Sequence, residues 1–370
     1  MTVTIPLKLA QRTQTILLRT MRQYTESFNR VCQIGWQQPR INGVALHHLT
    51  YYGERESTDL PSQLVVSART KATEALKSAK TKQKKKEKVR CPQSKRACIR
   101  YDQRTMTLNF DKRKVTLSSL KGRMQAKLLI PKYAEKYLEW KPRSADLCLH
   151  KNGKLHLHLV FEKAFERKAI QKVVGIDLGV NRPAVTSECD FYGERRWKEV
   201  ENRYFRLKRK LQAKGTKSAK RHLKKIAQKV NRFRTDCDHV LSKRLVTAYG
   251  EGTLLVLEDL TDIRKRVKVR KKQRRRIHGW SFARLKSFLE YKAIIYGCQV
   301  DYVDPRYTSQ KCSKCEYIDK RNRKTQSEFV CKRCEFKHNA DLNAAKNIRL
   351  NHLASSGISV GGGPQSIGLS

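Results

Sequence analysis

The chain has 370 residues, of which 82 are Lys or Arg and 33 are Asp or Glu, so its formal net charge is +49 at pH 7. So much like charge destabilises a compact fold by itself, which predicts a polyanionic partner, with nucleic acid as the leading class. A membrane surface is less favoured, because no apolar stretch is long enough to span a bilayer and no amphipathic anchor is evident. The first residues resemble no export signal, which predicts a cytoplasmic protein.

In the first half of the chain, one short strand, one helical region and a set of alternating segments follow one another. Residues 2–9 alternate apolar and polar side chains, as a strand does, and residues 11–88 change to a polar, helical pattern. Several alternating segments come next, and Asn152-Gly153 lies between two of them. Asn-Gly between alternating segments is the strongest short signal for a β-hairpin. We therefore expect a small antiparallel β domain over about 90–165, which the first strand could join, leaving the helical region as an insertion.

The second half alternates buried-type strands with basic helices. Apolar strands are predicted over 172–177, 253–258 and 299–303, and a long basic helical region over about 201–249. An amphipathic helix is predicted over 281–296, with Gly297 at its C-terminal cap. The remaining predicted segments are a basic loop over 264–276 with 10 Lys or Arg in 13 residues, a helix over about 340–353, and a Gly/Ser-rich tail over 354–370 that is expected to be disordered.

The cysteines divide into scattered and clustered residues. Of the 11 cysteines, seven stand singly, which is typical of a reducing compartment and not of a disulfide framework. The other four form two pairs, Cys312-x2-Cys315 and Cys331-x2-Cys334, separated by 15 residues. Two such turns can close a tetrahedron of thiolates around Zn²⁺. The spacing therefore predicts a structural zinc ribbon, and the basic residues between the pairs, among them Arg321 and Arg323, are expected to contact phosphate.

Three acidic residues occur where a metal-dependent hydrolase would need them. Asp177 and Glu258 end two apolar strands, and Asp341 opens the helix that follows the ribbon. Converging carboxylates can hold two Mg²⁺ ions, which activate water and stabilise the leaving group in phosphodiester hydrolysis. Each acid taken alone has a simpler explanation, because an Asp at a strand end commonly lies in a turn and Asp341 could be a helix N-cap.

Three segments with their intervening motifs resemble the TnpB family, the transposon-encoded OrfB-type proteins related to type V CRISPR effectors. The segments are Val174-Gly175-Ile176-Asp177-Leu178-Gly179, Leu257-Glu258-Asp259-Leu260, and Asp341-Leu342-Asn343-Ala344-Ala345-Lys346-Asn347-Ile348. Between them, in the family's order, lie Trp280-Ser281-Phe282, Glu290-Tyr291-Lys292-Ala293, and Val303-Asp304-Pro305-Arg306-Tyr307-Thr308-Ser309-Gln310. The resemblance covers about 172–350 and is only architectural before residue 170.

The resemblance implies a fold of α/β and mixed character and an RNA-guided DNA endonuclease. Asp177, Glu258 and Asp341 would be the catalytic acids of a RuvC-like, RNase H-type domain and would bind two Mg²⁺ ions. A guide RNA and a target double-stranded DNA with a short adjacent motif would be the partners, in the cytosol of a bacterium or archaeon and near its nucleoid. Basic side chains that we predict to contact nucleic acid are Arg264, Lys271, Arg275, Arg321 and Arg323.

The resemblance also assigns the domains. A β-barrel-like wedge domain with a helical recognition insertion would precede the RuvC-like domain, which in turn would contain the zinc ribbon. The expected ranges are 1–10 and 90–170 for the wedge, 11–89 for the insertion, 171–305 and 340–353 for the RuvC-like domain, 306–339 for the ribbon, and 354–370 for the tail.

The sequence departs from the family at three positions. The family often has glycine directly after the second cysteine of each pair, where this chain has Glu316 and Glu335. Two residues before the third acid, the family often has a further Asp, and here the residue is Asn339. All four cysteines and all three acids are present.

Three other functions are compatible with parts of the sequence. The Gly175–Gly179 segment also resembles the first phosphate motif of actin-like ATPases, but their hydroxyl residues and Gly-rich second loop are missing. An RNA-guided repressor that binds DNA without cutting would share the architecture, although here all three acids are present. An RNA-binding zinc-ribbon scaffold would explain the charge and the cysteines and leave the acids without a role.

Overall fold

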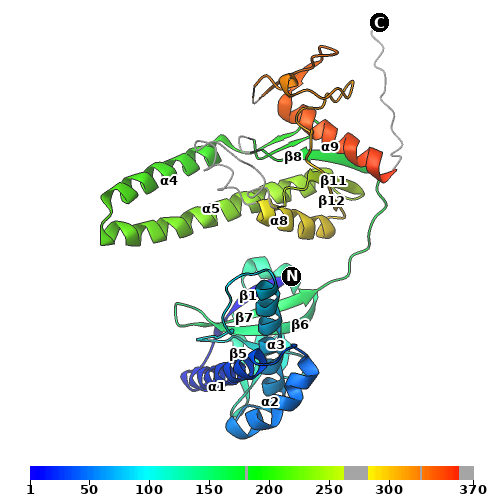
Figure 1. Cartoon of the computed structure of the whole chain (residues 1–370). Coiled ribbons are helices and arrows are strands. Elements are labelled where there is room, and N and C mark those ends of the chain that lie inside the picture. The colour runs from blue at the N-terminus through cyan, green and yellow to red at the C-terminus, as the bar shows by residue number, and fades with distance from the viewer. Residues whose placement is uncertain (180–181, 262–281, 326, 358–370) are drawn as a thin grey trace. The chain divides into compact units, whose positions relative to one another are not determined.

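A computed structural model describes the chain except for residues 180–181, 262–281, 326 and 358–370 (Figure 1). The predicted basic loop over 264–276 and Trp280-Ser281 therefore lie outside the described residues. The chain divides into two compact units, Met1–Ala164 and Phe165–Ser370. Each unit is described by itself below. Among the described residues, no helix combines the length and the apolar character that crossing a bilayer requires.

The first unit is built on an antiparallel sheet of seven strands in the order β2-β6-β7-β1-β5-β4-β3. The predicted N-terminal strand is confirmed: β1 pairs with both β7 and β5 and so lies in the middle of a barrel-like, nearly closed sheet. The Asn152-Gly153 hairpin is also confirmed, because β6 and β7 pair antiparallel and Gly153 has a φ of +76°. The strands are β1 (Thr2–Lys8), β2 (Ile99–Tyr101), β3 (Met106–Asn109), β4 (Lys114–Ser119), β5 (Gly122–Leu128), β6 (Lys141–Leu149) and β7 (Leu155–Glu162), with a 3₁₀ turn at Lys132–Tyr137.

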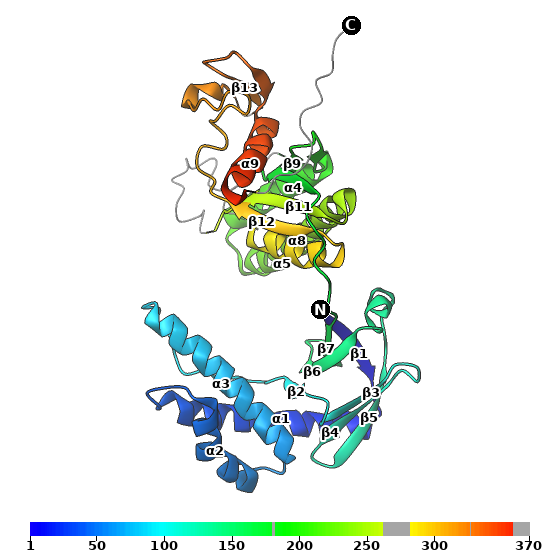
Figure 2. The ribbon, with the colours of Figure 1, turned by 90° about the vertical axis from the view of Figure 1, so that its right-hand side faces the viewer.

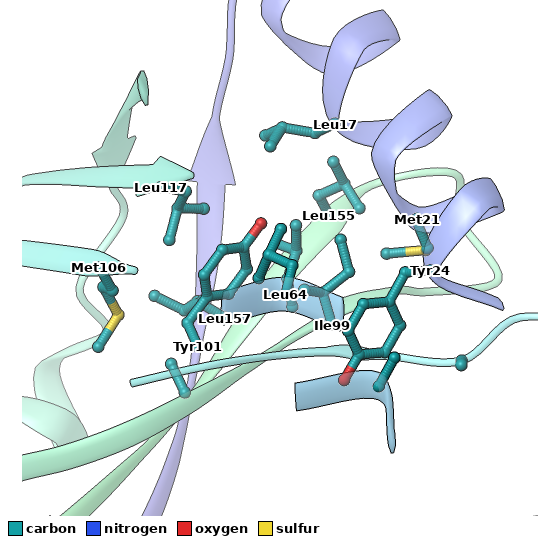
Figure 3. Packing of buried hydrophobic residues seen from close by; sticks show 14 of the residues in the cluster. Leu17, Met21, Tyr24, Leu64, Ile99, Tyr101, Met106, Leu117, Leu155 and Leu157 are labelled. Atoms are coloured by element: carbon teal, nitrogen blue, oxygen red, sulfur yellow. The ribbon is translucent and has the colours of Figure 1, made fainter. Parts of the chain in front are cut away.

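The polar helical region between β1 and β2 forms three helices, α1 (Gln11–Trp36), α2 (Gly43–Ser57) and α3 (Ser62–Lys84). Asn42 caps α2 by accepting from the amides of Val44 and Ala45. The apolar side of α1, with Leu17, Met21 and Tyr24, packs with α3 onto the inner face of the sheet (Figure 3). The helices and the strands thus share one hydrophobic core, shown around Leu64, Ile99, Tyr101, Leu155 and Leu157.

Two cysteines that were expected to be single are paired. Cys98 and Cys148 form a disulfide, with their Cα atoms 4.7 Å apart. They are brought together because β2 and β6 pair with Ile99 opposite Leu147, which places the flanking residues 98 and 148 on neighbouring strands. The sequence spacing of 50 residues carries no sign of this strand pairing.

The described part of the second unit holds a five-stranded sheet in the order β10-β9-β8-β11-β12. The strands are β8 (Lys172–Asp177), β9 (Ala184–Thr186), β10 (Phe191–Tyr192), β11 (Thr253–Glu258) and β12 (Gln299–Val303). The three predicted strands β8, β11 and β12 are confirmed and run parallel to one another. β9 pairs antiparallel with β8, and β10 pairs antiparallel with β9. After β8, the chain adds β9 and β10 on one side of β8. It then adds β11 and β12 on the other side, so the direction in which strands are added changes between β8 and β11.

Helices cover both faces of this sheet (Figure 2). On one face, α5 (Lys217–Tyr249) and α8 (Phe282–Ile295) pack on alternate residues of the strands, for example Leu245 and Leu285 against Ile176 and Leu257. On the other face, Ile348 of α9 (Ala340–Ser356) packs against Val173, Leu254 and Val256. The predicted last helix is therefore confirmed, and it continues to Ser356, into the segment expected to be a disordered tail.

The long basic region is a helical hairpin that starts earlier than predicted. α4 (Arg195–Lys214) and α5 run side by side and are separated by two residues (Figure 1). Gly215, with a φ of +63°, ends α4, and the Thr216 side chain caps α5 by accepting from the amide of Ala219. Glycine followed by an N-cap residue is a stop signal followed by a start signal, so the break was readable in the sequence.

The backbone of α9 approaches β8 at Gly175, which has no side chain to keep it away. A Cβ at this position would lie 2.6 Å from the amide nitrogen of Arg349 and closer still to the carbonyl oxygen of Ala345. Both of these are backbone atoms, so no side-chain rotation can relieve the clash. Gly175 therefore sets the distance between the strand that ends at Asp177 and the helix that carries Asp341.

Replacing Gly175 with Ala is expected to destabilise the second unit by about 1–3 kcal/mol, as overpacking of a close-packed core does. It should also move α9 away from β8 and reduce any activity that needs Asp177 and Asp341 together. Thermal unfolding measures the first effect. The matched control is Gly53→Ala in α2, where a Cβ has open space and no effect beyond a small gain in stability is expected. Equal stability of G175A and wild type would contradict this account of the helix position.

Candidate functional site

The three predicted acids lie at one end of the five-stranded sheet. β8 and β11 are parallel neighbours with Ile176 opposite Leu257, so the following residues, Asp177 and Glu258, end adjacent strands at the same edge. Asp341 lies in the first turn of α9, which packs on β8. The carboxyl ends of parallel strands at a change of winding direction are where α/β folds commonly bind ligands.

The position of Asp341 is fixed by a cap and by an ion pair. The side chain of Asn339 is the N-cap of α9 and accepts from the amides of Asp341 and Leu342, so the alternative in which Asp341 is the cap is wrong. Nη2 of Arg323 lies 3.1 Å from Oδ1 of Asp341, and both side chains are largely buried, at 25% and 13% exposure. Asn339, where the family often has Asp, thus starts the helix that presents the third acid.

The three carboxylates interact electrostatically. Burial raises the pKa of Asp177 well above its ordinary range, and the charges of Glu258 and Asp341 raise this pKa further, against a lowering effect of Arg323. Burial also raises the pKa of Glu258, while a hydrogen bond from Thr308 and the charge of Arg323 lower it. Raised pKa values are expected where several carboxylates lie close together away from water. A nearby cation lowers the repulsion between their charges and so lowers these pKa values.

Two residues of the site were not assigned to it from the sequence. Arg323 was predicted only as a nucleic-acid contact from the ribbon, and in the structure it pairs with Asp341, while its contact with nucleic acid stays a prediction. Thr308 donates a hydrogen bond from its hydroxyl to Oε1 of Glu258, and its carbonyl accepts from the side chain of Asn347 in α9. Thr308 lies in the motif that precedes the first cysteine pair, which was the only signal for it.

The donor set of the acidic site suits Mg²⁺. Carboxylate oxygens are hard ligands, and Mg²⁺ keeps several waters, so two or three acids are sufficient to hold it. Among the described residues, the oxygens of the three carboxylates lie further apart than the four sulfurs of the cysteines: one oxygen from each acid does not give a set within 4.8 Å. A spread of this kind is compatible with two ions about 3.5–4 Å apart, each held by a part of the set.

The four predicted zinc ligands do come together. The sulfur atoms of Cys312, Cys315, Cys331 and Cys334 all lie within 4.8 Å of one another. Two of the sulfur pairs, Cys312–Cys334 and Cys315–Cys331, are separated by 3.7 and 3.6 Å. Zinc–sulfur bonds of about 2.3 Å in a tetrahedron place the sulfurs about 3.8 Å apart, so the cluster can hold a metal ion of this kind.

The turns that present the cysteines need residues with positive φ. Glu316 and Glu335, which follow the second cysteine of each pair, have φ values of +63° and +56°. Their amides donate to the carbonyls of Cys312 and Cys331 and so close the two turns. This conformation favours glycine, the residue that the TnpB family often has at these two positions. Glutamate adopts it here at a cost in free energy.

Replacing Glu335 with Gly is expected to stabilise the ribbon by about 1 kcal/mol, because glycine adopts a left-handed conformation without the cost that a Cβ imposes. At 25 °C this corresponds to an approximately fivefold tighter hold on zinc. Competition with a chelator measures it. Glu335→Ala keeps the Cβ and should show no gain, so an equal gain in both variants would attribute the effect to charge and contradict the backbone explanation.

Of the other predicted nucleic-acid contacts, only Arg321 is on the surface in the described part of the chain. Its side chain is 74% exposed and forms an ion pair with Asp319 at 2.7 Å. Asp319 caps the 3₁₀ turn at Lys320–Asn322, between the two cysteine turns. Arg264, Lys271 and Arg275 lie outside the described residues. Contact of these side chains with nucleic acid stays a prediction.

Two family models match the chain, both from residue 158 onward. A family model described as a probable transposase, OrfB_IS605, matches residues 158–263, and one described as a Cas12f1-like TNB domain matches residues 282–348. A CRISPR-associated endodeoxyribonuclease Cas12f1 of Sulfoacidibacillus thermotolerans is 32% identical over 57% of this chain and 54% of its own length. A TnpB-like protein of Aquifex aeolicus is 25% identical over 59% of this chain and 81% of its own length.

The fold is similar to that of a solved structure over nearly the whole chain. The cryo-EM structure of a Cas12f1–sgRNA–target DNA complex superimposes with a TM-score of 0.69 and 16% sequence identity, covering 92% of this chain and 83% of that one. The fold is thus similar to that of Cas12f1, with mixed α and β content, a barrel-like sheet and a four-cysteine cluster. In sequence, the chain is similar to OrfB_IS605 transposases and to TnpB-like proteins. The matched region spans about half the length of the Cas12f1 relative.

Proposed function

We propose that the protein is an RNA-guided DNA endonuclease and that Asp177, Glu258 and Asp341 are its catalytic acids. The observation that carries the proposal is the gathering of these acids, about 80 residues apart in the chain, at one edge of the sheet where their charges affect one another. We further propose that the five-stranded sheet with its helices is the RuvC-like, RNase H-type domain and that the four-cysteine ribbon holds one structural Zn²⁺. The strand order and the donor sets support these assignments.

Hydrolysis of a phosphodiester requires that a water oxygen attack phosphorus while one P–O ester bond breaks. Two Mg²⁺ ions, when bound, supply activation of that water and charge stabilisation of the leaving oxygen. Asp177, Glu258 and Asp341 would hold the ions. Thr308 orients the Glu258 carboxylate through its hydrogen bond, so that the other oxygen of Glu258 remains for a metal.

Arg323 has a second role in this proposal. It is the cation that compensates the acidic site in the present arrangement, as shown by its ion pair with Asp341 and by its lowering effect on the pKa values of Asp177 and Glu258. With metal ions held by the acids, this compensation would no longer be needed. The Arg323 guanidinium would then pair with an oxygen of the scissile phosphate, for which its planar fork is well suited.

Sequence specificity would come from RNA. The relative of 32% identity is named an endodeoxyribonuclease, and the similar solved structure contains an sgRNA and target DNA. In RNA-guided recognition the protein binds the heteroduplex through its shape and backbone, and base pairing reads the sequence. A net charge of +49 suits a chain that neutralises the phosphates of a guide RNA and a target. The first unit would then be the wedge domain with its helical recognition insertion, acting in a bacterial or archaeal cytoplasm.

The proposal is tested by expressing the full chain together with its flanking DNA, sequencing the RNA that co-purifies, and incubating the complex with target plasmid in Mg²⁺. The expected result is one defined RNA species and linearised plasmid only when the plasmid contains the matching sequence. Binding of the matching plasmid without cleavage would identify a repressor and contradict the nuclease. Absence of a defined RNA would contradict guided recognition.

A further inference from the structure

Tyr307 combines a strained backbone with an exposed aromatic ring. It has a φ of +62°, a conformation that a bulky residue rarely adopts, and 55% of its surface is exposed. A left-handed conformation at a residue with a large side chain costs free energy, and it persists only where surrounding contacts fix it. Strained backbone conformations of this kind concentrate at functional sites.

Contacts from three directions hold the turn that carries Tyr307. Its carbonyl oxygen accepts from the amides of Gln310 and Lys311, each at 2.8 Å. The next residue, Thr308, is buried and is bound on one side to the carboxylate of Glu258 and on the other to the Asn347 side chain, at 2.8 Å. The ring of Tyr307 is thus presented to solvent by a rigid turn that is bonded directly to the acidic site.

Other exposed apolar side chains of the second unit lack this combination. Phe191, Ile294 and Ile318 are exposed to a similar degree, but among the described residues none of the three has a positive φ or a neighbour bonded to a catalytic acid. Single exposed apolar residues are common on protein surfaces and need no function. Exposure alone therefore does not mark Tyr307; its left-handed backbone and its place next to Thr308 do.

We propose that the ring of Tyr307 stacks on a base of the single DNA strand that occupies the acidic site. This proposal rests on the proposed function, because it names a contact to the same substrate. Aromatic rings are sequence-tolerant platforms for single strands, since every base offers a π-face. The neighbouring Arg306 side chain is 79% exposed, at 3.1 Å from Asp304, and can contact the adjacent phosphate. A ring on a turn fixed by these hydrogen bonds needs little ordering on binding, and the turn is joined to Glu258 through the neighbouring Thr308.

The test measures strand binding and not cleavage. In an Asp177→Asn background, which should not cut, a short single-stranded DNA with one 2-aminopurine is titrated, and its fluorescence reports stacking on an aromatic ring. Tyr307→Phe should bind and quench as the Tyr307 protein does. Tyr307→Ala should lose the quenching at the base over the acidic site and bind about tenfold more weakly, which is typical of one lost stacking contact. Ile318→Ala is the control and should change neither reading.

A second variant separates stacking from strain. Tyr307→Gly relieves the left-handed backbone, so we expect a higher melting temperature together with the same loss of binding and quenching as in Tyr307→Ala. A purely structural role would raise the melting temperature and leave binding unchanged, which would overturn the proposal. Binding and quenching by Tyr307→Ala equal to those of the Tyr307 protein would overturn it as well. If the Asp177→Asn protein with Tyr307 intact stacks the strand and the wild-type protein cuts no target, the proposed function fails while this contact stands.

Discussion

Replacing Asp177 with Asn is expected to reduce target cleavage by a factor of about a thousand or more, as loss of a central catalytic group commonly does. The amide has nearly the shape of the carboxylate, so the packing of β8 should be preserved. It lacks the negative charge that a divalent cation needs, and the charges of Glu258 and Asp341 both act on Asp177 by raising its pKa. Binding of RNA and target should be unchanged, because the proposed function assigns it to basic side chains and not to this carboxylate. Cleavage of a plasmid and a filter-binding assay on the same preparations measure the two quantities.

Asp259→Asn is the matched control for this variant. Asp259 follows Glu258 directly, and its carboxylate accepts from the amide and hydroxyl of Thr261, a local turn contact. Cleavage by D259N within about threefold of wild type would show that position in the site, and not acidity in this segment, decides activity. A D177N protein that cuts as fast as wild type would remove Asp177 from the catalytic set.

Loss of the four-cysteine cluster is the second large effect that we expect. Cys331→Ser should lower the zinc content from one ion per chain to none, because serine offers no thiolate to complete the four-sulfur site. The ribbon should unfold with the loss, since structural zinc sites supply on the order of 10 kcal/mol to the folding of such small units. Cleavage should be lost with the zinc. The reason is the short path from ribbon to site: Asn339 ends β14 (Lys337–Asn339) and caps α9, and Arg323 reaches Asp341 from between the two cysteine pairs.

Cys189→Ser provides the comparison, since Cys189 is exposed and lies outside the cluster. It should keep both the zinc and the activity. Elemental analysis of zinc and plasmid cleavage are the measurements. If Cys331→Ser lost the metal and still cut the target, the ribbon would be independent of the acidic site, and its coupling through Asn339 and Arg323 would be wrong.

The sequence predicted those features that local pattern determines. Alternation and apolar runs indicated the strands that end at Asp177 and Glu258, and Asn152-Gly153 indicated the β6–β7 hairpin, all confirmed by the structure. Spacing alone predicted the gathering of the four cysteines. The placing of three acids in one site needed the resemblance to a family, because a strand-end acid has several ordinary explanations.

Features that depend on tertiary contact were not predictable in the same way. The ion pair of Arg323 with Asp341 was not predicted, because nothing in a linear sequence shows that the ribbon folds back toward α9. The Cys98–Cys148 disulfide depends on the pairing of β2 with β6, which are 40 residues apart along the chain. The role of Gly175 depends on the backbone of α9, which lies more than 160 residues later. Each of these contacts is set by packing and not by local propensity.

Anomalous diffraction from crystals soaked in Mn²⁺, a cation that takes the same oxygen ligands as Mg²⁺, tests the central claim most directly. We expect two manganese peaks about 3.5–4 Å apart, ligated by Asp177, Glu258 and Asp341, with Arg323 displaced from Asp341. A wild-type crystal with its Arg323–Asp341 pair intact and no manganese at these carboxylates would contradict it.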